Sequence, residues 1–253
     1  MGSVNELSVL IIAKNEASMI GNCILSARLL SPLEIIVIDD ESTDKTVAIS
    51  KNLGVHVYSH LKKNFAEARN FGFQKAQGLW ILYIDADERI SSELALEIKN
   101  VVNRFPIDYQ AYRLRRVNYY LGKRWPKDEK ITRLFYKRNL ETWYGTIHES
   151  PKVKGKISDL KGQLVHYTHR SLTDMVQTTL VWSVMEAKLR FDSGHPSVYW
   201  WRFPRVMLPV FIDYFIVQNG WKVGTVGLIE SIYQSFSIFI TYALLWEMQQ
   251  KTY

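Results

Sequence analysis

The chain has 253 residues with 47% hydrophobic and 13% aromatic content, which is enough for a full core and excludes a largely disordered protein. Its single cysteine, Cys23, excludes an internal disulfide and fits a reducing compartment. The formal net charge is +7, and residues 113–138 hold ten Lys or Arg against two acids, which is either a solvated face or a surface that attracts phosphate groups.

Two further expectations concern partners and location. No nucleic-acid-binding motif accompanies the basic stretch, so no nucleic acid is expected as a partner. Residues 1–6 do not show the basic and then apolar pattern of a secretory signal. We therefore expect the protein to act in the cytoplasm.

The first hundred residues alternate between strand and helix patterns. Apolar runs at residues 7–13, 34–38, 55–58 and 80–84 predict buried strands, and residues 16–30, 43–54 and 65–77 predict the helices between them. This alternation is typical of an α/β protein with a doubly wound, mostly parallel sheet. Right-handed crossovers would place the carboxyl ends of these strands along one edge of the sheet.

Polar side chains follow three of these strands. Asn15 follows the first, Asp39 and Asp40 follow the second, and Asp85 and Asp87 follow the strand that begins at Trp80. Open α/β sheets bind their ligands at this edge. Asp85 and Asp87 would share a face and could hold Mg²⁺ or Mn²⁺ with a phosphate, although a helix cap and a loop carboxylate are the alternative. A dinucleotide fold is not expected, because residues 13–17 contain no glycine.

Four motifs, in order, resemble a known enzyme family. They are residues 7–16 (LSVLIIAKNE), 36–44 (IVIDDESTD), 68–72 (ARNFG) and 85–88 (DADE). Together they resemble the inverting family 2 glycosyltransferases of the GT-A fold, and most of all the small bacterial enzymes that add a hexose, often glucose, to the lipopolysaccharide inner core. The resemblance is close over residues 7–170 and looser beyond.

The resemblance implies a UDP-linked nucleotide-sugar donor and a divalent metal, Mn²⁺ or Mg²⁺. Asp40 matches a position that hydrogen-bonds a uracil imide N–H, with Asp39 supporting the turn, and Arg69 matches a basic position near the diphosphate. Asp87 matches the metal-binding aspartate of the D-x-D motif, and Asp85 would face the ribose or the metal. The predicted donor site comprises Asn15, Asp39, Asp40, Arg69 and Asp85.

An inverting transfer also needs a base for the acceptor hydroxyl. Residues 143–150 (WYGTIHES) resemble the family's glycine-containing acceptor loop and the acidic pair after it, which assigns the base to Glu149. His148 is the competing candidate, because the ordinary pKa of an imidazole lies nearer neutrality. A loop pair without a function is the remaining alternative.

A histidine near residues 164–170 (LVHYTHR) often binds the metal in GT-A enzymes. His166 fits this position, and His169 is the second candidate. A histidine that follows an apolar pair can also be a core residue with satisfied hydrogen bonds. The predicted metal ligands are thus Asp85, Asp87 and His166.

The composition changes after residue 170, which predicts a catalytic domain over residues 1–170 and a helical region over residues 171–253. Polar residues interrupt the apolar segments 206–217 and 226–246, so a membrane-spanning helix is not expected. Trp, Tyr and Arg crowd residues 199–205, which suits the lipid–water interface. We expect peripheral membrane attachment; packing on the catalytic domain, or on a second copy in a homo-oligomer, is the alternative.

The leading hypothesis is a metal-dependent inverting glycosyltransferase. It would move a hexose, glucose from UDP-glucose, onto a membrane glycolipid such as the lipopolysaccharide inner core, at the inner face of the cytoplasmic membrane. One alternative is a nucleotidyltransferase, which would need a glycine-rich phosphate loop where residues 13–16 stand. The other is a nucleotide-sugar-binding protein without turnover, which would be expected to lose Asp85, Asp87 or Glu149, and all three are present.

Overall fold

The chain forms two compact units. In the computed structural model, which describes residues 6–61, 64–145 and 149–251, the sheet unit comprises Met1–Val117 and Glu129–His166. The helical unit comprises Asn118–Asp128 and Tyr167–Tyr253. The predicted boundary at residue 170 lies near the last of these transitions, whereas residues 118–128 group with the helical unit.

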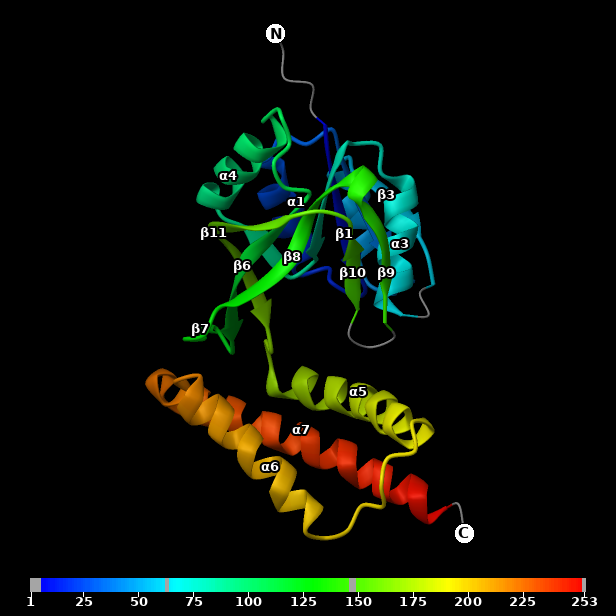
Figure 1. Ribbon diagram of the computed structural model, residues 1–253, viewed down its shortest axis with the longest axis vertical. Helices are drawn as coiled ribbons and strands as arrows, with labels where there is room; N and C mark the ends of the chain where they lie inside the picture. The colour runs from blue at the N-terminus through cyan, green and yellow to red at the C-terminus, as the bar shows by residue number, and fades with distance from the viewer. Residues whose placement is uncertain (1–5, 62–63, 146–148, 252–253) are drawn as a thin grey trace. The chain divides into compact units, whose positions relative to one another are not determined.

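The strands form one nine-stranded sheet and one two-stranded sheet (Figure 1). The large sheet contains β1 (Leu7–Ala13), β2 (Glu34–Asp39), β3 (His56–Ser59), β4 (Trp80–Asp85), β5 (Glu88–Ile90), β6 (Ala111–Tyr120), β7 (Lys123–Arg124), β8 (Glu129–Tyr136) and β11 (Ile157–Thr168). The small sheet pairs β9 (Leu140–Tyr144) with β10 (Ser150–Val153). Between the strands lie α1 (Ile20–Arg28), α2 (Thr46–Asn52), α3 (Phe65–Lys75), α4 (Ser92–Val102) and the short η1 (Lys137–Asn139).

The strand order is β3-β2-β1-β4-β8-β6-β11-β5, with β7 paired to β6. Strands β1 to β4 are parallel, as the strand–helix alternation predicted. The pairs β4–β8, β6–β8 and β5–β11 are antiparallel, so the sheet is mixed and only its first half is parallel. For β6 and β8 the reason is that no helix separates them, because strands joined without a crossover helix pair antiparallel.

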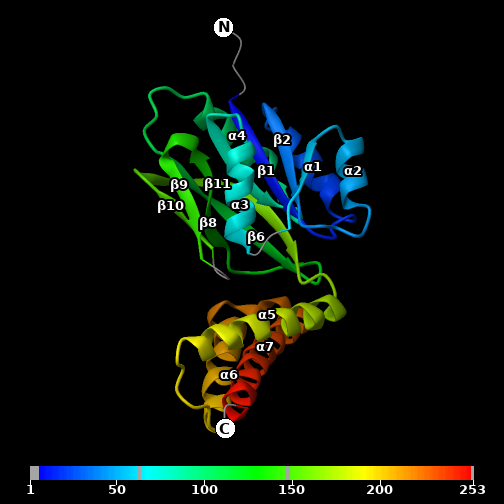
Figure 2. The same cartoon turned by 90° about the vertical axis from the view of Figure 1, so that its right-hand side faces the viewer.

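The two faces of the sheet carry separate cores, because side chains alternate along each strand. Val9 and Ile11 of β1 pack with α1 and α4, whereas Leu10 and Ile12 pack with α3 and β9. Figure 2 shows α3 and the β9–β10 hairpin on one face and α1 and α2 on the other. With both faces covered, a ligand can reach the parallel strands only at their ends.

Two helices of the sheet unit, α3 and α4, begin with a side-chain cap, whereas α1 and α2 have no side-chain cap hydrogen bond. Asn64 accepts a hydrogen bond from the Glu67 backbone N–H at 2.9 Å, at the start of α3. Ser91 does the same for Leu94 at 3.2 Å, at the start of α4. The short strand β5 separates this helix from Asp85 and Asp87, so neither aspartate caps it.

The helical unit contains α5 (Leu172–Asp192), α6 (Arg202–Ile212), η2 (Asp213–Val217), η3 (Gly220–Val223) and α7 (Thr225–Gln250). Helix α7 packs against both α5 and α6. Its 26 residues are continuous, and among the described residues it is the one helix long and apolar enough to cross a membrane by length and composition. This differs from the sequence-based expectation, because the polar residues taken as interruptions lie on the helix and do not end it.

The close packing of β11 on α4 gives a test of the fold. A Cβ atom on Gly162 would lie 2.4 Å from the backbone N and Cα of Leu94. We therefore expect Gly162→Ala to lower the free energy of unfolding by about 1–3 kcal/mol in denaturant titrations, because backbone atoms cannot move aside as a side chain can. Gly21→Ala in α1 is the control, since its Cβ would meet only Ile49 at 3.7 Å and should stabilise the helix by about 0.5–1 kcal/mol. Equal stability of the Gly162 variant and the unaltered chain would contradict this packing.

Candidate active site

The polar residues predicted at the sheet edge do lie side by side. In the parallel registers, Ala13 pairs with Asp39 and Ile12 pairs with Asp85. The carboxyl ends of β2, β1 and β4 are therefore neighbours, in that order. This is the edge at which open α/β sheets bind their ligands.

Asn15 joins the turn after β1 to the loop after β2. Its backbone takes a left-handed conformation with φ of 54°, and its backbone N–H donates to the Ser42 hydroxyl at 2.8 Å. Its side-chain oxygen accepts from the Thr43 backbone N–H at 2.8 Å. Asn15 thus fixes the shape of this part of the edge, and its contact with a ligand stays a prediction.

The two acids after β2 are both buried. Asp39 Oδ2 accepts a hydrogen bond from the Ser42 backbone N–H at 3.0 Å, which is the turn-supporting role predicted for this residue. Asp40 Oδ2 forms an ion pair with Lys14 Nζ at 3.0 Å. Half of the Lys14 side chain is exposed, so an incoming ligand can displace it at little cost.

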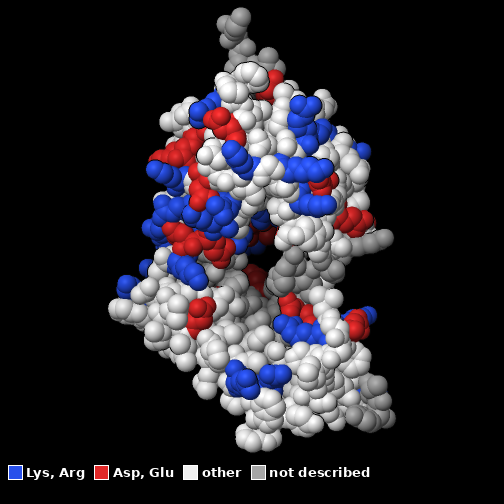
Figure 3. Space-filling view, in the orientation of Figure 1, with Lys and Arg blue, Asp and Glu red and all other residues white. Residues whose placement is uncertain are grey.

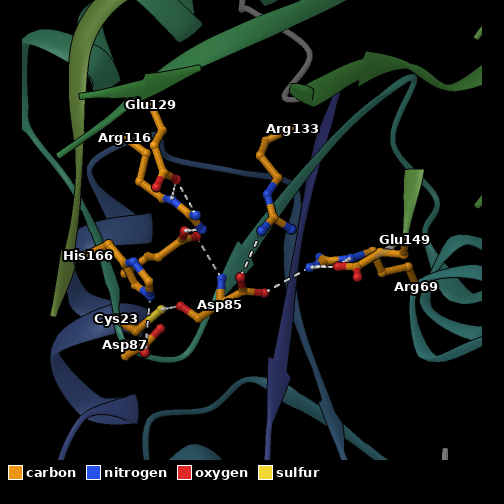
Figure 4. A network of polar contacts seen from close by, with 10 residues as sticks. Cys23, Arg69, Asp85, Asp87, Arg116, Glu129, Arg133, Glu149 and His166 are labelled. Carbon is orange, nitrogen blue, oxygen red and sulfur yellow. Dashed lines mark hydrogen bonds and ion pairs between the residues drawn. The ribbon is translucent and has the colours of Figure 1, made fainter. Parts of the chain in front are cut away.

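Asp85 lies between two arginines (Figure 4). Its Oδ1 accepts from Arg69 at 3.1 Å and its Oδ2 accepts from Arg133 at 2.8 Å. Burial alone would raise the pKa of Asp85, but the charges of Arg133 and Arg69 outweigh it and hold this pKa well below its usual range. Asp85 is therefore ionised at neutral pH, and both of its oxygens are used by arginines.

Arg69 connects Asp85 to the predicted base. Its side chain is 1% exposed, and it donates to Glu149 Oε1 through Nε at 3.2 Å and through a terminal nitrogen at 3.0 Å. The guanidinium carbon also lies 4.9 Å from the centre of the Trp143 ring. Burial would lower the pKa of Arg69, but the Asp85 and Glu149 carboxylates raise it, so this buried cation stays charged.

A second acid, Glu88, supports the backbone of Asp85. It is fully buried, and its Oε2 accepts from the Asp85 backbone N–H at 2.8 Å. Burial and the neighbouring Asp85 charge raise the pKa of Glu88. Arg116 lies 3.5 Å from Glu88 Oε1 and pairs more closely with Glu129, at 2.5 Å.

Asp87 is paired with His166. The His166 Nε2 atom lies 3.4 Å from Asp87 Oδ2, and both side chains are partly buried. Burial would lower the pKa of His166, but the hydrogen bond and the charge of Asp87 raise it. Behind them, the Cys23 thiol donates to the Asp85 carbonyl at 3.4 Å, and burial raises its pKa, which makes this thiol unreactive.

The residues around Asp87 fit a divalent cation that a phosphate ligand completes. A carboxylate oxygen and an imidazole nitrogen already face each other there, and Mg²⁺ and Mn²⁺ accept one or two protein ligands with phosphate and water. Within the described parts of the chain, no three His, Cys, Asp or Glu side chains are arranged to hold a metal by themselves. Because both Asp85 oxygens face arginines, Asp87 and His166 are the better ligands.

Two predicted residues remain, the alternative base His148 and the alternative metal ligand His169. His148 lies outside the described residues. His169 belongs to the helical unit, where its Nδ1 lies 2.9 Å from both carboxylate oxygens of Glu230. Since Glu230 already engages this ring, His166 remains the metal-ligand candidate of the two.

Sequence reasoning missed three residues of this network, namely Arg133, Glu88 and Arg116. Arg133 sits next to Leu134 and Phe135, which are fully buried in β8. An arginine next to such a run is a signal that a buried acid lies nearby, because an unpaired buried cation is costly. The high charge of residues 113–138 concealed this signal, since every basic residue there was read as part of one surface patch.

The arrangement can bind a doubly charged anion next to a carboxylate that can act as a base. Arg69 and Arg133 supply positive charge at the sheet edge, Asp87 with His166 can hold a cation, and Glu149 touches Arg69. Groups of this kind stabilise phosphate oxygens and accept a proton from a hydroxyl.

Comparisons with known proteins identify the family to which the chain is similar. A family model described as glycosyl transferase family 2 matches residues 8–155. An uncharacterized glycosyltransferase of Rickettsia prowazekii is 30% identical over 98% of this chain and 89% of its own length. The lipopolysaccharide core biosynthesis glycosyltransferase LpsC of Rhizobium meliloti is 23% identical, covering 95% of this chain and 92% of LpsC. Among solved structures, S. aureus TarS in complex with UDP-GlcNAc aligns with a TM-score of 0.49 and 12% identity, over 98% of this chain and 92% of that one.

The shared carboxylate of Asp85 gives a stability prediction. We expect Asp85→Asn to lower the free energy of unfolding at pH 7 by roughly 2–4 kcal/mol, because two arginines lose their partner. The pKa of Asp85 is lower in the folded chain than in the unfolded chain, so its ionised carboxylate stabilises the fold at neutral pH. This stabilisation is lost as the pH falls and the carboxylate becomes protonated. The deficit of the variant should therefore shrink when denaturant titrations are repeated below about pH 4.

The matched control for this prediction is Asp108→Asn, which removes an exposed i,i+4 pair with Arg104. Its effect should stay within about 0.5 kcal/mol at every pH. A deficit of the Asp85 variant that is as small as that of the control would contradict the network.

Proposed function

The chain belongs to glycosyl transferase family 2, and we propose that it is a metal-dependent inverting hexosyltransferase with a UDP-sugar donor, such as UDP-glucose, and a membrane glycolipid acceptor. One observation carries the proposal: Arg69 touches both Asp85 at the end of β4 and Glu149, the predicted base. The donor phosphates and the acceptor hydroxyl would thus meet at one guanidinium. The family match and the Rickettsia prowazekii relative support transfer of a sugar as the reaction.

The donor would lie along the carboxyl ends of β2, β1 and β4. Asp40 would accept the imide N–H of uracil, while Asp39 and Asn15 hold the loops around it. To do so, Asp40 would give up its ion pair with the half-exposed Lys14 and bind uracil in its place. The diphosphate would then lie against Arg69 and Arg133, which Asp85 holds in place.

Asp87 and His166 would hold the divalent metal. When bound there, the metal supplies Lewis-acid stabilisation of the departing diphosphate. His166 can ligate only when its Nε2 is deprotonated, and its pairing with Asp87 fixes the direction of that nitrogen.

Glu149 would take the proton from the acceptor hydroxyl. Both hydrogen bonds from Arg69 go to Oε1, so Arg69 orients the carboxylate through one oxygen. Arg69 is buried and stacked near Trp143, so it is a rigid support. His148 stays the second candidate for the base.

The acceptor would be a lipid-linked oligosaccharide such as the lipopolysaccharide inner core, met at the inner face of the cytoplasmic membrane. The name of the Rhizobium meliloti relative supports this acceptor class. The basic residues 113–138 contribute less to membrane attraction than their number indicates, because Arg113 and Lys130 pair with Asp159 and Arg116 pairs with Glu129. Peripheral attachment would therefore rely on the helical unit.

Mass spectrometry of reaction products tests the whole proposal. The purified chain with Mn²⁺, a panel of nucleotide sugars and extracted glycolipids should yield one glycolipid that gains a hexose mass and releases UDP. Pyrophosphate release from a nucleoside triphosphate and a sugar phosphate would instead identify a nucleotidyltransferase. Tight UDP-sugar binding without product from any acceptor would favour the binding protein.

The metal site gives the next prediction. Asp87→Ala should abolish the part of UDP affinity that depends on Mn²⁺, because it removes the carboxylate ligand next to His166. Isothermal titration calorimetry with Mn²⁺ and with EDTA measures this part directly. Asp108→Ala serves as the control, and an Asp87 variant with normal Mn²⁺-dependent affinity would show that the metal binds elsewhere.

The base gives a kinetic prediction. Glu149→Gln should keep donor affinity but lower kcat by about 10²-fold or more, because the amide cannot accept the proton. Glu141→Gln is the matched control, since Glu141 lies on the same hairpin and pairs with Lys152 and Lys154 on the surface. A Glu149 variant with near-normal kcat would move the base to His148.

A further inference from the structure

The helical unit has an inverted distribution of side chains. The residues that α5 buries are Met175, Thr179, Ser183 and Ala187, and those that α7 buries are Gly227, Glu230, Ser231, Ser235, Thr241 and Leu245. Most of these are small or polar. Helix α6 is almost entirely apolar, yet it buries none of its residues. A bundle that folds in water places its large apolar side chains inside, so this unit is not built for water on all sides.

Hydrogen bonds between helices fill this polar interior. Thr179 on α5 donates to the Tyr233 hydroxyl on α7 at 2.7 Å, and Thr241 donates to Ser183 at 3.1 Å. Ser235 on α7 donates to the Met207 carbonyl on α6 at 3.0 Å. Small residues and hydrogen-bonded hydroxyls at helix contacts are typical of helices that pack within lipid.

An apolar row runs along the outer surface of α6 and of η2, the π-helical segment that continues it. Leu208 and Ile212 of α6 and Ile216 of η2, which we call the α6 row, are 60%, 50% and 55% exposed. Their four-residue spacing places them on one face. Figure 3 shows that the helical unit presents few charged side chains on the side in view. An exposed apolar face of this kind marks an interaction site.

Tryptophans and basic side chains stand at both ends of the row. At one end, Arg202 and Arg205 lie 5.3 and 5.9 Å from the centre of the Trp201 ring. At the other end, Lys222 lies 5.3 Å from the centre of the Trp221 ring. From residue 193 to residue 222 the sequence has one acid, Asp213, which accepts a hydrogen bond from Gln218 at 2.6 Å. Tryptophan with Arg or Lys is the combination found at the headgroup level of a bilayer, and an excess of positive charge fits anionic lipid.

Helix α6 is too short to cross a bilayer. Its 11 residues and the 5 residues of η2 that continue it span at most about 24 Å, whereas the hydrocarbon core is about 30 Å thick. A helix with an apolar face and basic ends then lies along the interface, with that face in the acyl chains.

We propose that the α6 row inserts into the hydrocarbon of one leaflet of an anionic bilayer, with Trp201 and Trp221 at the headgroups. The inference deepens the membrane attachment in the proposed function by naming the surface and its lipid. It rests on the side chains of the helical unit alone, so it stands or fails separately from sugar transfer.

Flotation of the full chain with vesicles tests the proposal. The unaltered chain should float with vesicles of phosphatidylcholine and 30% phosphatidylglycerol, and Leu208→Ser with Ile212→Ser and Ile216→Ser should lower the vesicle partition coefficient at least about tenfold. The control is Leu25→Ser with Leu61→Ser and Leu96→Ser, three sheet-unit leucines that are 50%, 62% and 62% exposed. This control should bind vesicles like the unaltered chain.

Two further measurements do not depend on how the α6-row variant folds. Arg205→Gln with Lys222→Gln should weaken binding to the anionic vesicles about 30-fold and leave binding to pure phosphatidylcholine unchanged. Acyl-brominated lipid should quench the tryptophan fluorescence of the unaltered chain, and Trp200→Phe with Trp201→Phe and Trp221→Phe should remove most of this quenching, because all three are exposed.

Three results would overturn the proposal. They are an unaltered chain that does not float, an α6-row variant that floats like its control, and a dimer in light scattering that the α6-row variant dissociates without any vesicle binding. The last result would assign the row to a second copy of the chain. Calorimetric UDP binding with Mn²⁺ should be the same for both triple variants, so loss of vesicle binding with intact UDP binding separates this proposal from the proposed function.

Discussion

The carboxylate of Asp85 is the constraint on which the candidate site depends. It joins α3 through Arg69 to the antiparallel half of the sheet through Arg133, and its backbone N–H is held by Glu88. Arg69 in turn holds Glu149. Two almost fully buried arginines are tolerable only while each keeps its acid, because an unpaired buried charge costs several kcal/mol. The geometry of the site is thus fixed by charge pairing before any ligand binds, which is the condition for a preorganised active site.

The parallel half of the sheet could be predicted because its signals are local. Buried strands such as β1 read as unbroken apolar runs, and the polar turn residues that follow mark their ends. The antiparallel half was not predicted, although β6 places Tyr112 and Leu114 in the core and Arg113 outward between them. There the high charge of residues 113–138 concealed the alternation, and strand pairing over long separations leaves no signal in a short window.

Sequence reasoning named several of the residues that lie together at the sheet edge, but it did not predict how they pair. The D-x-D spacing indicated that Asp85 and Asp87 share a face and one metal, whereas the structure gives Asp85 to two arginines and Asp87 to His166. The difference arises from Arg133, which is 48 residues away in sequence. Charge pairs between distant strands favour the ionised form of a carboxylate and occupy its oxygens, and no local sequence pattern indicates such pairs.

The helical unit shows a further reason why sequence reasoning fell short. Counting uninterrupted apolar residues treated Glu230 and Gln234 as breaks in a lipid-facing segment, yet they lie inside one helix, where Gln234 donates to Glu230 and Glu230 holds His169. Whether a helix can contact lipid depends on the polarity of its outer face alone. Polar groups on its inner face form hydrogen bonds with neighbouring helices and do not contact lipid. The helical unit therefore buries several polar groups while it exposes an apolar row on α6 and η2. The polar residues within segment 226–246 argued against a spanning helix. In the structure, polar side chains of α7 form hydrogen bonds to α5 and α6, and the outer apolar surface stays available to lipid.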